Sequence, residues 1–101
     1  MEPDKQALKV STLGTEGKTK PFFVVRGDVV SNIDDLANCI QSLSDEQFKH
    51  HVTMTKNDFA AWIYGVLKNP FLARDLDLAG NRTNKVQYVK TIRDHVAWLR
   101  N

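Results

Sequence analysis

The spacing of the apolar residues changes at Ser31, and this change limits the folds open to the chain. Before Ser31, residues 22–30 hold two short aromatic or β-branched runs around Gly27-Asp28, a pattern typical of a β-hairpin. Beyond it, apolar residues recur at helical spacing, first at Ile33, Leu36, Ala37, Ile40 and Leu43. Such a stripe is one face of an amphipathic helix, so the sequence predicts a mostly α domain behind a hairpin.

Capping residues divide the helical part into about five short helices. A side-chain oxygen at a helix start accepts a hydrogen bond from a free backbone N–H, and proline is tolerated in the first turn. We therefore expect helices to start at Ser31 or Asn32, at Ser44 with Gln47, at Thr55 with Asp58, at Asn69 with Pro70, and at Thr83. The fourth helix is expected to stop at Gly80. Phe59 and Trp62 lie on the apolar face of the third, and we expect Trp62 in the core.

The first 20 residues differ in composition from the rest. They are rich in Lys, Thr, Gly and Glu, and Pro3, Gly14 and Gly17 interrupt any regular element. We expect a flexible N-terminal arm over residues 1–20 and a single helical domain over residues 21–101. The expected fold class is a compact bundle of about five short helices, preceded by a β-hairpin at residues 22–30.

Several classes of protein do not fit the composition. No apolar run approaches the roughly 18 residues of a membrane span, and the polar N-terminus lacks the layout of a signal peptide. Cys39 is the only cysteine, which leaves no internal disulfide and no cysteine cluster for zinc. We expect a soluble cytoplasmic protein without membrane contact.

The histidines do not predict a metal or catalytic site. His50 and His51 are neighbours and would point about 100° apart on a helix, whereas two helical ligands of one metal are four residues apart. His51, Asp58 and Cys39 could be combined as a hydrolytic set, but no nucleophile motif accompanies them. We interpret His51 as structural, its ring bonding Asp58 or a backbone carbonyl, and we expect no catalytic residue, metal or cofactor.

Charge is unevenly distributed along the chain. Residues 1–20 carry +1, residues 21–80 carry −3 and residues 81–101 carry +4, which together give the net charge of +2. This pattern fits either attraction between parts of the chain or a basic partner surface. Our leading hypothesis is a non-catalytic protein-interaction module that offers a protein partner, or a second copy, the residues Arg82, Lys85, Tyr88, Lys90, Arg93 and Trp98. The alternative is a nucleic-acid-binding accessory domain, in which these cations contact phosphates and Tyr88 stacks on bases.

One stretch resembles a known family. Residues 22–78 resemble a small domain of unknown function from archaea and bacteria, on the elements Phe22-Phe23, Gly27, Asn32–Leu36, His51-Val52, Asn57-Asp58-Phe59 with Trp62, and Leu72-Ala73. The basic C-terminal helix lies outside this pattern. The resemblance implies a compact helical module, sometimes appended to other domains, with no assigned activity. It would make His51, Asn57, Asp58, Phe59 and Trp62 a structural motif.

Overall fold

The mostly α fold with a short hairpin is confirmed by the computed structural model, which describes residues 4–14 and 20–101. Within these ranges there are seven helices, two more than expected, and one two-stranded antiparallel sheet. The elements are α1 (Lys5–Leu13), β1 (Phe22–Phe23), β2 (Val29–Val30), α2 (Ile33–Ser42), α3 (Asp45–His51), α4 (Asp58–Gly65), α5 (Pro70–Leu76), α6 (Ala79–Arg82) and α7 (Lys85–Arg100).

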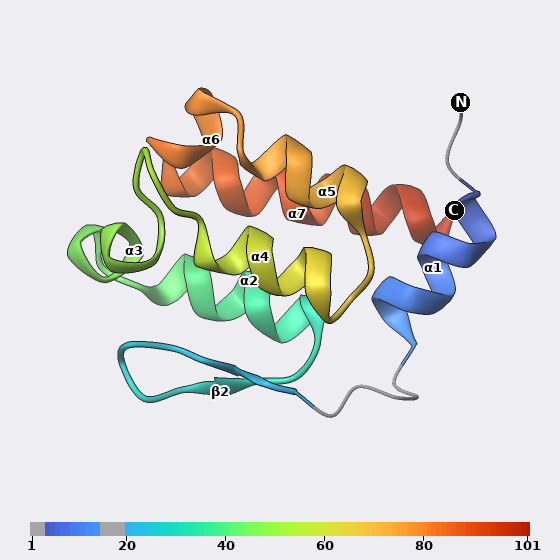
Figure 1. The fold of residues 1–101 in the computed structure, drawn as a ribbon, viewed down its shortest axis with the longest axis horizontal. Helices are drawn as coiled ribbons and strands as arrows, with labels where there is room; N and C mark the ends of the chain where they lie inside the picture. Colours follow the sequence, from blue (N-terminus) through green and yellow to red (C-terminus); the bar gives the residue numbers. More distant parts are fainter. Residues whose placement is uncertain (1–3, 15–19) are drawn as a thin grey trace.

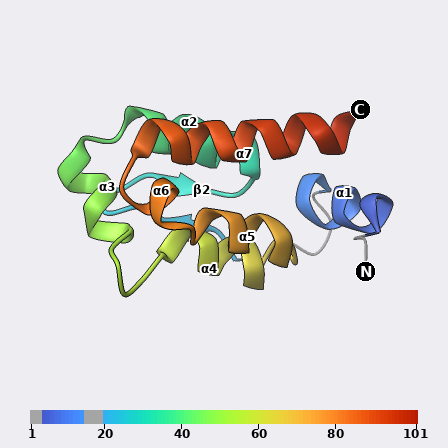
Figure 2. The ribbon, with the colours of Figure 1, turned by 90° about the horizontal axis from the view of Figure 1, so that it is seen from above.

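The helices form layers above the hairpin (Figure 1). The hairpin lies beneath α2 and α4, while α5 and α7 lie on the far side of these two helices. Figure 2 shows α7 running nearly the length of the molecule, with α1 near its C-terminal end. Helices α2 and α7 pack together and run antiparallel. Asp34 at the start of α2 contacts Arg100 at the end of α7. No helix of the described ranges is both long and apolar enough to cross a membrane.

The hairpin is held by its turn and by its inward side chains. Phe22 pairs with Val30, and Gly27 at the turn has a φ of 109°, a backbone conformation that favours glycine. The Arg26 guanidinium donates to both carboxylate oxygens of Asp28, at 2.9 and 3.0 Å, and also to Ser42 at the end of α2. Since an isolated hairpin is marginal in water, this clamp and the burial of Val30 hold it against the helices.

Two predicted helix starts are wrong by one or two residues. In both cases the residue that caps the helix in the structure is an asparagine. Asn57, not Thr55, caps α4 by accepting from the backbone N–H of Ala60. Asn84, not Thr83, caps α7, while the Thr83 hydroxyl donates to the carbonyl of Ala79 and so closes α6. The helix expected from Asn69 to Gly80 ends at Leu76, and α6 follows it as a separate turn.

Part of the expected N-terminal arm is a helix. Asp4 caps α1 by accepting from the Ala7 N–H, and α1 packs on α7 with Leu8 and Thr12 buried. The sequence signal is present but weak, because the buried residues of α1 are only Leu8 and the polar Thr12, about one helical turn apart. Residues 1–3 and 15–19 of the expected arm lie outside the described ranges.

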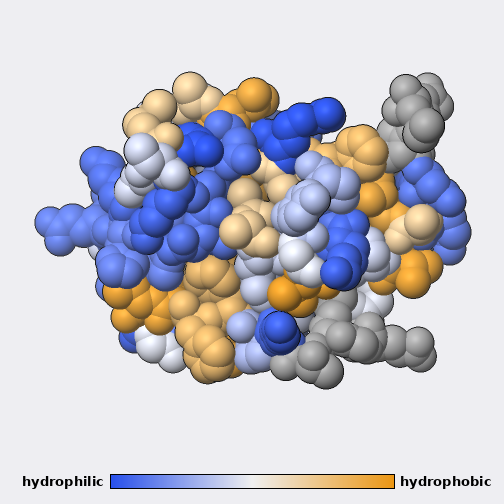
Figure 3. All heavy atoms as spheres, in the orientation of Figure 1, coloured by the Kyte–Doolittle hydropathy of each residue, from blue (hydrophilic) through white to orange (hydrophobic). Residues whose placement is uncertain are grey.

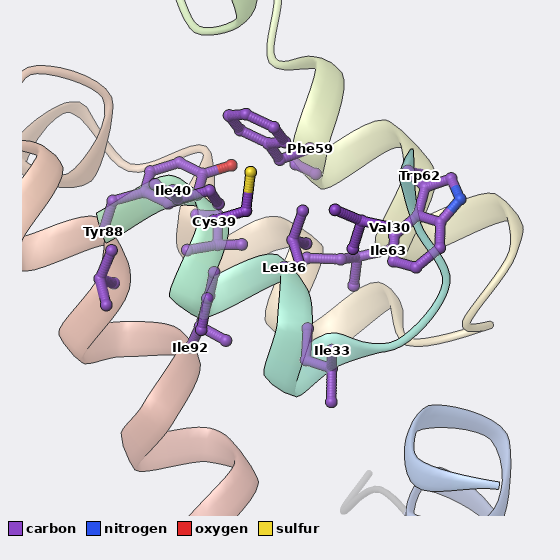
Figure 4. Close-up of a cluster of buried hydrophobic side chains, with 14 of the residues drawn as sticks. Val30, Ile33, Leu36, Cys39, Ile40, Phe59, Trp62, Ile63, Tyr88 and Ile92 are labelled. Atoms are coloured by element: carbon purple, nitrogen blue, oxygen red, sulfur yellow. The ribbon is translucent and has the colours of Figure 1, made fainter. Parts of the chain in front are cut away.

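The core is one cluster of side chains from the hairpin and all the helices from α2 to α7 except α6 (Figure 4). Trp62 is 8% exposed, and its indole N–H donates to the carbonyl of Lys20 at 2.8 Å. The ring of Phe22 lies against Phe59 and Trp62, with centroids 5.0 and 6.3 Å away. The expected core position of Trp62 is confirmed.

Replacing Trp62 by alanine should lower the free energy of unfolding by about 3–5 kcal/mol, the usual cost of truncating a large buried aromatic side chain. Tyr64→Ala is a matched control because Tyr64 is exposed on the same helix, and it should change stability by no more than about 0.5 kcal/mol. Urea unfolding measures both. A loss below about 1 kcal/mol for Trp62→Ala would contradict the core assignment.

Candidate functional site

His51 is a buried structural residue at the end of α3. Its Nδ1 lies 3.0 Å from an Asp58 carboxylate oxygen, so the expected bond between them is present. Its Nε2 accepts the backbone N–H of Val25 in the hairpin, also at 3.0 Å. An accepting Nε2 carries no proton, which places the proton of the neutral ring on Nδ1, where it is donated to Asp58. Both nitrogens are therefore occupied and hold α3, the hairpin and α4 together.

The pKa of the Asp58 carboxyl group depends on its hydrogen bond with His51. Burial raises the pKa of Asp58, but hydrogen bonds from His51 and Lys56 outweigh this effect and leave the pKa below its ordinary value of 3.8. A carboxyl group with a lowered folded-state pKa contributes stability above its unfolded-state pKa, and this is lost as the pH falls through the folded-state value. Across neutral pH the Asp58 carboxylate stays charged.

Asn57 joins three helices through one buried side chain. Its Oδ1 accepts the Ala60 N–H and the Tyr88 hydroxyl, the latter at 2.6 Å. Its Nδ2 donates to the carbonyl of Leu76 and to the carboxylate of Asp77, at 2.9 and 3.0 Å. Both amide hydrogens and both lone pairs of the carbonyl oxygen are thus engaged. This side chain fixes α7 and the end of α5 relative to the start of α4.

Two of the expected surface residues have other roles. Tyr88 is fully buried, and Figure 4 shows its ring inside the core cluster, so its assignment to a partner surface is wrong. Burial also raises the pKa of its hydroxyl far above the ordinary value. Arg82 lies in α6 rather than in the last helix, and its guanidinium donates to Asp77 and to the carbonyl of Thr53. It braces the loop between α3 and α4.

Three cations of α7 are bonded to α2. Lys85 donates to the carbonyls of Gln41 and Leu43 at the C-terminal end of α2. Arg93 donates to the Asn38 side chain at 2.8 Å, and Arg100 donates to both carboxylate oxygens of Asp34. The basic residues 81–101 thus contact polar groups along the length of α2. Attraction within the chain accounts for part of the uneven distribution of charge.

A shallow groove follows the seam between these helices, and we call it the α2–α7 groove. It consists of two hollows of about 470 and 440 Å³ that share Arg93. Its α7 rim is the stripe Val86, Lys90, Arg93, Ala97 and Arg100, and its α2 rim includes Asp34, Asn38 and Gln41. Val86 is 75% exposed here.

Trp98, the last expected partner residue, lies beside this stripe and is 40% exposed. The ammonium of Lys5 in α1 lies 5.1 Å from the centre of its ring, and the centre of the His95 ring lies 5.4 Å away. Part of Trp98 is therefore covered by α1, and it belongs to the α1–α7 contact rather than to the groove.

A second exposed apolar surface lies on the hairpin. Phe23 and Val29 are cross-strand neighbours and are 70% and 59% exposed. In Figure 3 hydrophobic residues gather along the lower left edge, where the hairpin runs, next to the hydrophilic end around α3. Exposed apolar pairs of this kind occur at interaction surfaces.

Comparison of the chain with family models, curated proteins and solved structures finds no significant match. The family resemblance carried by residues 22–78 therefore stays a prediction. Within the described ranges, no group of three or more His, Cys, Asp or Glu side chains is placed to hold a metal ion.

Replacing Asn57 by alanine should lower the free energy of unfolding by about 1.5–5 kcal/mol. The loss combines a helix cap, worth about 0.5–2 kcal/mol, with unpaired buried polar groups at about 1–3 kcal/mol. The matched control is Asn84→Ala, which removes an exposed asparagine cap and should cost about 1 kcal/mol. Chemical denaturation checks both, and equal losses would contradict the central role of Asn57.

Proposed function

We propose that this chain is a non-catalytic protein-interaction module whose partner contributes an acidic amphipathic segment to the α2–α7 groove. The observation that carries the proposal is the exposure of Val86 beside Lys90 and Arg93 at one of the two hollows. An apolar side chain between cations suits a segment that presents apolar side chains between carboxylates.

The charge of the groove supports an acidic partner. The side chains that line its two hollows include four cations, Lys85, Lys90, Arg93 and Arg100, against the two carboxylates of Asp34 and Asp94, an excess of two positive charges. Such an excess steers an acidic segment toward the groove. A second copy docked groove to groove would bring like charges together, so a different protein fits better than a homo-oligomer.

The nucleic-acid alternative has less support from the same residues. Tyr88, the side chain expected to stack on bases, is buried in the core. Asp34 and Asp94 would also face the phosphates, which costs free energy in a site that binds a polyanion. The alternative is tested together with the proposal because both depend on the same cations.

The proposal is tested by following amide NMR shifts while a helical peptide of Glu and Leu is added. We expect shifts at Val86, Lys90, Arg93 and Ala97, and none with a peptide in which Lys replaces Glu. Val86→Asp should weaken binding about tenfold or more, because it removes the apolar contact and adds a repelling charge. Arg93→Glu should also weaken it, whereas Arg74→Glu makes the same change at an exposed residue of α5 outside the groove and should not.

Three results would contradict the proposal. Groove residues that do not shift with the acidic peptide would remove its basis. Shifts confined to Phe23 and Val29 would move the partner surface to the hairpin. Shifts along α7 with a mixed-sequence single-stranded DNA, disappearing as salt is raised, would favour the nucleic-acid alternative.

A further inference from the structure

The two hollows of the α2–α7 groove are lined by positions of α7 that repeat after seven residues. The hollow of about 440 Å³, which we call the Val86 hollow, is lined from α7 by Lys85, Val86, Val89, Lys90, Arg93 and Asp94. The hollow of about 470 Å³, which we call the Ala97 hollow, is lined by the six residues found seven positions further on, from Ile92 to the capping residue Asn101. One face of α7 therefore borders both hollows, and Arg93 belongs to each.

This repeat sets the distance between the hollows. Seven residues make almost two turns of an α-helix and cover about 10.5 Å along its axis. The residues of α2 follow the same order, since Ile33 and Ala37 line the Ala97 hollow and Gln41, further along the antiparallel helix, lines the Val86 hollow. A partner that fills both hollows must therefore present two side chains about 10.5 Å apart on one face.

A helical segment meets this distance, whereas an extended segment does not. In a helix, side chains seven positions apart lie on nearly the same face and about 10.5 Å apart along the axis. In a β-strand, side chains on one face are two or four residues apart, which gives about 6.7 or about 13 Å. The spacing of the hollows thus favours a helix as the occupant.

Both hollows offer apolar contact to such a helix. Ile33, Ala37 and Val96 supply it in the Ala97 hollow, and all three are buried. In the Val86 hollow the exposed side chain of Val86 lies beside the buried Val89. An aliphatic side chain such as leucine would lose apolar surface to water-free contact in either hollow, which favours binding.

Arg93, which both hollows share, is suited to bind a carboxylate of the partner. Its guanidinium donates to the neutral amide of Asn38 at 2.8 Å. The neighbouring cations Lys90 and Arg100 pair with carboxylates of this chain, but within residues 4–14 and 20–101 no carboxylate pairs with Arg93. An acidic residue midway between two apolar residues of the partner helix would lie on the same face and opposite Arg93.

We infer that the partner of the α2–α7 groove is a helix with apolar side chains seven positions apart and a carboxylate three or four positions after the first of them. The apolar side chains enter the Val86 and Ala97 hollows, and the carboxylate pairs with Arg93 between them. This inference rests on the proposed function and adds the conformation of the partner segment and the spacing of its contact residues.

The spacing is tested with three helical peptides of about 18 residues and identical composition, built from alanine and glutamate with two leucines. The first has its leucines seven positions apart and a glutamate four positions after the first leucine. In the other two, the second leucine changes places with a glutamate, so that the leucines are four or eleven positions apart. These spacings keep both leucines on one face but separate them by about 6 and about 16.5 Å.

We expect the first peptide to bind the full chain about tenfold or more tightly than the other two, because each of these fills only one hollow. Amide NMR titration measures the dissociation constants. With the first peptide, the signals of Val86 and Ala97 should shift together with a single dissociation constant.

The position of the carboxylate is tested with Arg93→Gln and with a form of the first peptide in which glutamine replaces the central glutamate. Arg93→Gln should weaken binding of the glutamate peptide by up to about fivefold, as expected for an exposed ion pair, and leave binding of the glutamine peptide nearly unchanged. Arg74→Gln makes the same change at an exposed residue of α5 outside the groove and should affect neither peptide.

The possible failures are distinguishable. Equal binding of the three peptides at the groove would overturn the spacing and leave the proposed function standing, whereas no binding by any of them would overturn both. Equal weakening of the glutamate and glutamine peptides by Arg93→Gln would overturn the assigned carboxylate contact. Shifts of the groove residues when the protein alone is concentrated would assign the groove to a second copy and overturn the inference.

Discussion

The hydrogen bonds of the Asn57 amide lie at the point where α4 begins, α5 ends and α7 passes. A buried amide with unmet donors or acceptors costs free energy, so this group favours the one arrangement that satisfies all of them. That arrangement directs Tyr88 into the core and rotates α7 about its axis accordingly. The opposite side of α7, with Val86 and Arg93, consequently faces the solvent beside α2. The groove is a consequence of this internal bond.

Asparagine serves this fold in a way that serine or threonine cannot. It caps α2, α4, α5 and α7 with its carbonyl oxygen, as any good capping residue does. Its NH₂ group remains free to donate elsewhere, and at Asn57 and Asn69 it reaches a different helix. A hydroxyl at the same position has a single hydrogen and a shorter reach. These two caps are therefore cross-links between helices as well as helix starts.

The sequence predicted the elements that depend on local signals and missed those that depend on distant partners. The capping box at Ser44 and the pairing of His51 with Asp58 follow from residues close in the chain. The rotation of α7 could not be predicted, because both Val86 and Tyr88 lie near an apolar stripe at helical spacing. The bond to Asn57, 31 positions away, decides between them. Likewise, Thr12 of α1 is bonded to Asn69, 57 positions away, which the residues of α1 do not indicate.

The cations of α7 that are bonded to α2 are still partly exposed to solvent. Arg100 and Asp34 are each about half exposed, at 52% and 53%, and surface ion pairs of this kind contribute little to stability. Bonding within the chain therefore does not remove these cations from use by a partner. A partner carboxylate can replace that of Asp34 at little cost, while the lysine bonded to the end of α2 keeps the two helices aligned. Attraction within the chain and a basic partner surface, two alternatives in the sequence, are compatible in the folded protein.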